Sequence, residues 1–177
     1  MRLLGRLRAR RGDPPPGTLP PLEREEYVVS WATTPLGVVA ATTYGLWWPE
    51  REGPRRIGWH LIDKASWQDG VLSVTEADVV DELLLVDRHP VRVALTEPND
   101  LPPAIRKRVE ASIVHNEQVA VGGGTVRIVA RHVPGQDGVR WWARYGAGAE
   151  DSAEVRLAVT NRIALLRADW ELKHPGG

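Results

Sequence analysis

The chain has 177 residues, of which 42% are hydrophobic and 26% are charged, and its formal net charge is zero. These values are ordinary for a soluble globular protein, and the length suits a single domain with its own core. The absence of cysteine excludes disulfides, thiolate zinc sites and cysteine catalysis, and no apolar run is long enough for a transmembrane helix.

The N-terminal segment, residues 1–22, differs in composition from the rest of the chain. Its first eleven residues carry five arginines and no acidic residue, whereas the remainder has an excess of five acidic residues. The stretch GDPPPGTLPP predicts an extended, flexible arm. Since the segment lacks a continuous apolar stretch, we expect no secretory signal and a cytoplasmic protein.

Strand-like segments begin near residue 26. They comprise EYVVSWAT, LGVVAATT, GLWWPE, an extended run over residues 55–67 and VLSVTEAD. The Asp69-Gly70 step predicts a tight hairpin before the last of these. Trp47 and Trp48 are consecutive in a strand and point to opposite faces. We therefore expect one indole to leave the core and to be covered by the protein itself.

A short helix is predicted over residues 100–112. Two prolines lie in its first turn, and Ile105, Val109 and Ile113 form one apolar stripe. After two further strand-like runs, linked by a glycine connector at residues 122–124, comes the segment GVRWWARYG. The intervening residues 134–138 predict a hairpin that joins TVRIVARHV to GVRWWARYG.

The last predicted element is a helix over residues 152–172, with Asp151 and Glu154 at capping-box spacing. Its apolar stripe consists of Val155, Val159, Ile163, Leu166 and Trp170. The whole pattern predicts a mostly β (α+β) domain over residues 23–172. We expect a small antiparallel β-barrel or sandwich that the amphipathic C-terminal helix closes, and a disordered tail at residues 173–177.

The segment GLWWPE…RRIGWHLIDKASWQDGVLSVTEAD resembles a group of uncharacterised actinobacterial proteins with a pleckstrin-homology-like (PH-like) core. Strands followed by a C-terminal helix, over about residues 26–170, are similar to that fold. The resemblance implies a scaffold or protein-binding module. The loop SWATTPLG lacks the basic residues that phosphoinositide-binding PH domains carry there, so lipid-headgroup recognition is not implied.

The two late strands carry the candidate binding surface. With a period of two, one face of the predicted hairpin presents Arg127, Arg131, Arg140, Trp142 and Arg144. If this face is exposed, arginines beside an indole can hold an anion, a nucleotide base or an acidic segment of a partner. The alternative is a ladder of Arg–Trp pairs that only stabilises the sheet.

The basic arm is the other candidate. A short amphipathic helix there would carry Leu3, Leu4, Arg6, Leu7, Arg8, Arg10 and Arg11. Such a segment predicts weak peripheral contact with an anionic membrane at its inner face. A plain disordered tail is the alternative.

Motifs for catalysis are absent from the sequence. It contains no HExxH, GxSxG or phosphate-loop pattern, and its five histidines lack metal-ligand spacing. We therefore expect no catalytic residue, cofactor or metal. The leading hypothesis is a non-enzymatic binding or scaffold module for a protein partner. The alternatives are nucleotide or nucleic-acid binding through the Arg/Trp face, and an enzyme whose site follows no known motif.

Overall fold

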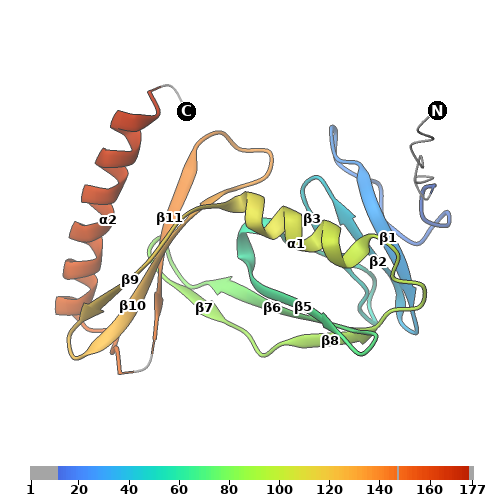
Figure 1. The fold of residues 1–177 in the computed structure, drawn as a ribbon, viewed down its shortest axis with the longest axis horizontal. Coiled ribbons are helices and arrows are strands. Elements are labelled where there is room, and N and C mark those ends of the chain that lie inside the picture. The colour runs from blue at the N-terminus through green and yellow to red at the C-terminus, as the bar shows by residue number, and fades with distance from the viewer. Residues whose placement is uncertain (1–11, 147, 176–177) are drawn as a thin grey trace, which may run out of the picture.

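The computed structural model describes residues 12–146 and 148–175, and its strands form three antiparallel sheets (Figure 1). The first sheet consists of β1 (Val28–Thr34), β2 (Gly37–Thr42), β3 (Gly45–Trp48) and β4 (Arg55–Gly58). The second consists of β5 (Ile62–Gln68), β6 (Val71–Val79), β7 (Leu85–Asp87) and β8 (Val91–Ala94). The third consists of β9 (Ile113–Val121), β10 (Gly124–His132) and β11 (Val139–Tyr145).

The mostly β prediction is confirmed, but within the described residues the strands do not close into a barrel. A 3-10 helix, Trp59–Leu61, interrupts the extended run predicted over residues 55–67 and sends β4 and β5 into different sheets. Helix α1 (Leu101–Ser112) likewise separates β8 from β9. Residue periodicity identifies strands one at a time, and it does not show which strands pair across such interruptions.

The larger core lies between the first sheet, the second sheet and α1. It includes Leu46, Ile62, Leu101 and Ile105, all of which are buried. The predicted helix over residues 100–112 is confirmed. Ile113, the expected end of its stripe, instead begins β9 and is exposed, and Leu101 extends the stripe at the other end.

The smaller core lies between the third sheet and α2 (Ala153–Lys173). The predicted stripe is confirmed, because this core contains Val155, Val159, Ile163, Leu166 and Trp170. The cap differs from the prediction. The amide of Val155 donates to the hydroxyl of Ser152 at 3.2 Å, so Ser152 caps the helix. Asp151 instead pairs with Arg156.

The two predicted turns are confirmed by their backbone angles. Asp69 and Gly70 join β5 to β6 with φ values of 52° and 78°, and Gly122 and Gly123 join β9 to β10 with φ values of 58° and 80°. Two consecutive residues at positive φ match the twist of a hairpin, which explains the use of glycine here.

Trp47 and Trp48 point to opposite faces, as predicted. Trp48 enters the larger core. The indole N–H of Trp47 donates to Glu26 Oε1 at 3.1 Å, and the protein itself covers this ring. Residues 12–22 lie beside the same sheet, where the indole N–H of Trp31 donates to the carbonyl of Gly12 at 2.7 Å.

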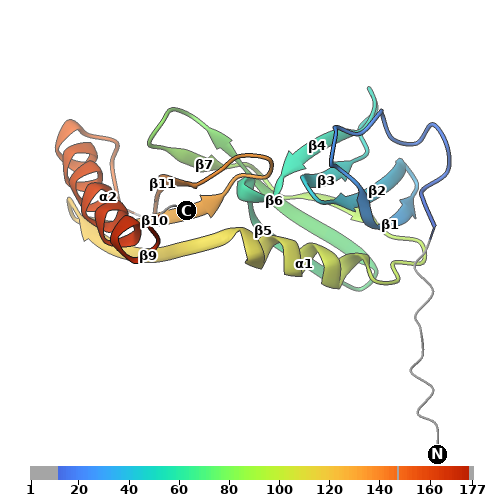
Figure 2. The same ribbon diagram turned by 90° about the horizontal axis from the view of Figure 1, so that it is seen from above.

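The molecule is elongated, with α2 at one end and the N-terminal segment at the other (Figures 1 and 2). The third sheet contacts the second through an apolar cluster of Ala77, Leu85, Val129 and Trp142. Leu84 and Ala143 also form an isolated parallel bridge. This junction places one face of β10 and β11 against the rest of the protein.

Candidate functional site

The five residues of the predicted binding face do share a face. Strand β10 pairs with β11 so that Arg127 lies opposite Arg144 and Arg131 lies opposite Arg140, with Trp142 between them. The predicted hairpin and its side-chain parity are therefore confirmed.

Most of this face is not exposed, as anion binding on it would require. Arg131, Trp142 and Arg144 are only 3%, 4% and 5% exposed. The face packs against the second sheet and α1, and of its five residues only Arg140 is exposed, while Arg127 is intermediate. Strand parity separates the two faces of a hairpin but does not tell which one another part of the chain covers.

Two aspartates from the second sheet pair with Arg127 and Arg144. Asp63 Oδ1 lies 2.5 Å from Arg127 Nη2 and 3.6 Å from Arg144 Nη1. Asp87 also pairs with Arg144. These contacts join the third sheet to the second, so the arginines there serve the packing of the protein.

Arg131 has no carboxylate partner among the described residues. It donates to the hydroxyl of Ser112 at 2.8 Å and to the carbonyl of Ile62 at 3.3 Å. Burial, together with the charge of Arg144, lowers the pKa of Arg131 to about 10. A guanidinium this deeply buried does not meet solvent and does not act as a surface anion site.

One ring face of Trp142 is covered by His60. The two rings stack with centroids 6.0 Å apart. Burial, followed by the charges of Arg131 and Arg140, lowers the pKa of His60 to about 4. His60 is therefore neutral at pH 7 and acts as part of the packing around the indole.

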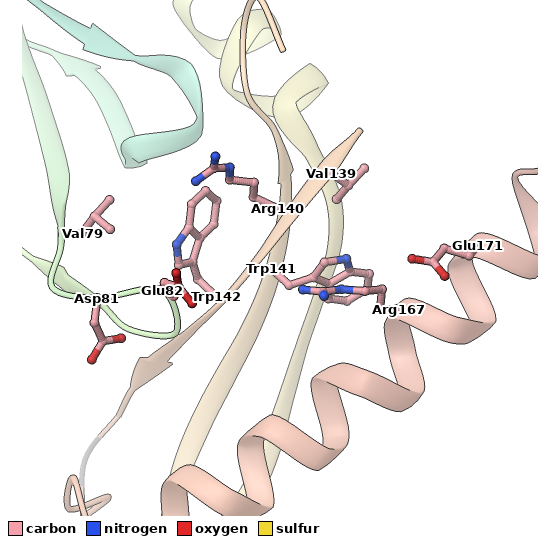
Figure 3. A pocket seen from close by; sticks show the side chains of 9 residues that line it. All are labelled: Val79, Asp81, Glu82, Val139, Arg140, Trp141, Trp142, Arg167 and Glu171. Carbon is pink, nitrogen blue, oxygen red and sulfur yellow. The ribbon is translucent and has the colours of Figure 1, made fainter. Parts of the chain in front are cut away.

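A pocket of about 730 Å³ opens beside Trp142, and it is the candidate functional site (Figure 3). We call it the β11 pocket. Its walls come from the end of β6 and the loop after it, from the start of β11 and from the C-terminal half of α2. It is lined by Val79, Asp81, Glu82, Val139, Arg140, Trp141, Trp142, Arg167 and Glu171.

Many polar groups in the β11 pocket lack a partner. Among the described residues, no ion pair is made by Arg140, Arg167, Glu82 or Glu171. The indole N–H groups of the two tryptophans likewise donate to no acceptor in this part of the chain. Neither indole nitrogen is a fully buried atom, so both N–H groups are accessible to a ligand that supplies acceptors.

The main chain of β11 is also open at this pocket. The amide of Ala143 donates away from β10, to the carbonyl of Leu83 at 2.7 Å. In an antiparallel pair this direction alternates, so Trp141 and Val139 also direct their N–H and C=O groups away from β10. Beyond the Leu84–Ala143 bridge, no described strand pairs with this edge.

The sequence prediction found two of the nine lining residues, Arg140 and Trp142. It missed the other seven, among them Trp141, Arg167 and Glu171. Arg167 and Glu171 lie one helical turn apart on α2, and no recognised motif marks them in the sequence. The candidate membrane arm, Leu3 to Arg11, lies outside the described residues.

Among residues 12–146 and 148–175, no cluster of three or more His, Cys, Asp or Glu side chains could hold a metal ion. In the same ranges, neither helix combines the length and the hydropathy that a membrane crossing requires.

Comparisons with protein-family models, with curated proteins and with solved structures each returned no match. The candidate site is therefore defined by its own geometry. It is a partly open pocket with two indoles, and within residues 12–146 and 148–175 its two arginines make no ion pair and its strand edge is free beyond the Ala143 bridge.

Proposed function

We propose that the protein is a non-enzymatic binding module, a scaffold or adaptor, that docks an extended, carboxylate-bearing segment of a partner protein in the β11 pocket. The observation that supports this most is the convergence of unpartnered donors. Arg140 and Arg167, the two indole N–H groups and the edge amide of Trp141 all belong to one pocket.

An extended segment suits this site because of the free strand edge. Added strands gain affinity from main-chain hydrogen bonds and specificity from alternate side chains. Along β11, Arg140 lies on the face of Trp142, whereas Arg167 lies beside Trp141 on the face that α2 covers (Figure 3). Two consecutive side chains of a docked strand would point to these two faces, one to each arginine.

A protein segment suits the pocket better than a nucleic acid does. The pocket wall also carries Asp81, Glu82 and Glu171, whose charges repel a phosphate backbone. The alternative hypothesis of nucleotide or nucleic-acid binding relied on an exposed Arg/Trp face, most of which is buried. A peptide can instead place basic groups against the carboxylates and acidic groups against the arginines.

The proposal extends to the fold family and to the location of the protein. The strand-rich chain with its C-terminal helix is consistent with a relative of PH-like proteins. The five arginines of residues 1–11 support a weak electrostatic tether to an anionic membrane in the cytoplasm. Co-sedimentation with anionic and neutral vesicles tests the tether. Full-length protein should pellet with anionic vesicles at low salt, whereas a chain that begins at Leu22 should not.

Selection from a random peptide library, followed by NMR, tests the docking site. Peptides selected on the full-length protein should carry carboxylates for the two arginines together with basic residues for the three pocket carboxylates. On binding they should shift the indole N–H signals of Trp141 and Trp142. The signal that disappears in Trp141→Phe or in Trp142→Phe identifies each of the two. Arg140→Ala or Arg167→Ala should weaken binding by about 10- to 150-fold, since a charge-assisted hydrogen bond contributes about 1.5–3 kcal/mol.

The matched control is Arg92→Ala, which removes an exposed arginine on β8. It should leave peptide affinity unchanged. If the peptides shift other signals, or if Arg92→Ala weakens binding as much as Arg140→Ala does, the docking site is wrongly placed. Oligonucleotide binding that weakens steeply with salt and is lost in Arg140→Ala would favour the nucleic-acid alternative.

A further inference from the structure

The third sheet ends at two unlike edges. At β11 the edge borders the pocket and is bridged at Ala143 to Leu84. At β9 the edge runs over nine residues, and no described strand pairs with it. Figure 2 shows β9 as the outer strand of this sheet.

The direction of the main-chain groups of β9 follows from the register. The amide of Ala143 points away from β10, so Ile128, which lies opposite, directs its groups toward β9. Glu117 faces Ile128 and is therefore hydrogen-bonded within the sheet. The N–H and C=O groups of Asn116, Gln118 and Ala120, which alternate with the hydrogen-bonded residues, therefore point outward at the free edge.

This edge lacks the usual protection against pairing. Natural edge strands are shielded by proline, lysine, bulges or exposed charge. Strand β9 has neither proline nor lysine, and its one irregularity lies at its start, before His115. Its one carboxylate, Glu117, is held by Arg162 of α2 at 2.6 and 3.0 Å.

Helix α2 presents exposed leucines on the same side. The Arg162–Glu117 pair shows which side of the helix faces β9, and Arg167 marks the opposite side, at the β11 pocket. At about 100° per residue, Leu165 and Leu172 lie on the β9 side, farther from the sheet than Arg162. Leu165 is 67% exposed and Leu172 is 82% exposed. Together with Ala158 they recur every seven residues, about two helical turns, and so lie along one line of α2.

We propose that two copies of the chain associate through β9 and α2 about a two-fold axis. The two β9 strands pair antiparallel, so that two three-stranded sheets become one continuous sheet. The two α2 helices pack on the same side through Ala158, Leu165 and Leu172. Such an interface is self-complementary, as a two-fold axis requires. It satisfies the outward main-chain groups and covers the leucines in one contact.

The register follows from the charges. If the axis passes beside Gln118, that residue faces Gln118 of the second copy, and Glu117 faces Val119. If it passes beside Glu117, two carboxylates lie directly opposite each other, which is unfavourable. The β11 pocket lies at the other edge of the sheet, so both pockets stay open and the dimer does not depend on the proposed docking function.

Cysteine cross-linking of the full chain tests this register, because the natural sequence contains no cysteine. Gln118→Cys should form an intermolecular disulfide on mild oxidation, since directly opposed residues of a hydrogen-bonded pair lie about 5.5 Å apart at Cα. Asn116→Cys should not, because the two-fold axis places this residue opposite Ala120 of the second copy and far from residue 116 of that copy. Cross-linking of Asn116→Cys in preference to Gln118→Cys would overturn the proposed register.

Sedimentation over a range of protein concentrations tests the dimer itself. The natural chain should be dimeric, and Leu165→Glu should raise its dissociation constant at least about tenfold. Leu157→Glu is the matched control, because Leu157 is equally exposed, at 63%, on another side of α2. Circular dichroism should show both variants folded. A natural chain that is monomeric throughout, or a loss of the dimer in Leu157→Glu but not in Leu165→Glu, would overturn the proposal.

Discussion

Glu26 joins the chain before β1 to the first sheet through one fully buried carboxylate. Its side chain is 0% exposed and accepts hydrogen bonds from Thr42 Oγ1 at 2.6 Å, Trp47 Nε1 at 3.1 Å and Arg56 Nη1 at 2.7 Å. Burial opposes ionisation of Glu26, but these hydrogen bonds, with that of the Glu23 amide, outweigh it and hold the pKa below its ordinary value.

The substitution Glu26→Gln keeps the shape of this side chain and removes its charge. The new amide can still accept a hydrogen bond from Thr42 or Trp47, but its NH₂ group cannot accept one from Arg56. A hydrogen bond to a charged group contributes about 1.5–3 kcal/mol, and breaking a buried pair costs about 3–5 kcal/mol. Since Arg56 is 28% exposed, water partly replaces its lost partner. We therefore expect the free energy of unfolding to fall by about 2–4 kcal/mol.

Urea unfolding followed by tryptophan fluorescence at pH 7 measures this loss. For a slope of about 2 kcal/mol per molar urea, the midpoint should fall by about 1–2 M. Glu25→Gln makes the same chemical change at the neighbouring exposed position and should alter stability by less than about 0.5 kcal/mol. Equal effects of the two substitutions would refute the assignment of a stabilising role to the buried carboxylate.

The pH dependence of the same comparison gives a second check. Because the pKa of Glu26 is lowered on folding, its stabilisation is fully present above the ordinary value of 4.5 and is lost as the pH falls through the folded value. The stability gap between the natural chain and Glu26→Gln should therefore narrow below pH 4.5. A gap that stays constant down to the acid transition would contradict the lowered pKa.

Three further predictions concern single elements. In thermal melting, Ser152→Ala should lower the free energy of unfolding by about 1 kcal/mol through loss of the α2 cap, and Asp151→Ala should lower it less. An equal loss in the two variants would contradict Ser152 as the cap. Gly70→Ala should cost about 1 kcal/mol in urea unfolding, because φ is 78° there while no atom lies within 4 Å of the added methyl. The pKa of His60 falls from 6.5 to about 4 on folding, so the unfolded chain binds more protons between these values and stability should drop as the pH falls through this window. His60→Phe should remove that part of the pH dependence, and an unchanged slope would show that His60 is not the group responsible.

Local chemistry accounts for the predictions that were confirmed. Helix α2 was found because its apolar stripe repeats with the period of a helix, and the Asp69-Gly70 turn was found because few dipeptides adopt two positive φ values. The opposite orientations of Trp47 and Trp48 follow from strand parity in the same way. Each of these depends on residues close together in the chain.

The errors arose where distant segments meet. Binding through the Arg/Trp face required an exposed face, but Asp63 and Asp87 of the second sheet pair with Arg127 and Arg144 there. The barrel was expected from strand order alone, and a 3-10 turn at Trp59–Leu61 with helix α1 divides the strands among three sheets. Two lining residues of the β11 pocket were predicted, but the pocket was not, because its walls come from three segments that are far apart in the sequence.

The sequence by itself determined the class of the protein, its two helices, its tight turns and the parity of the β10–β11 hairpin, since these depend on intervals of a few residues. Only the tertiary structure decided which face of that hairpin is buried, which arginines remain free and where the pocket lies. The physical reason is that burial and charge neutralisation depend on what packs against a surface. Here the partners come from β5, β7, α1 and α2, and no local pattern in β10 or β11 specifies them.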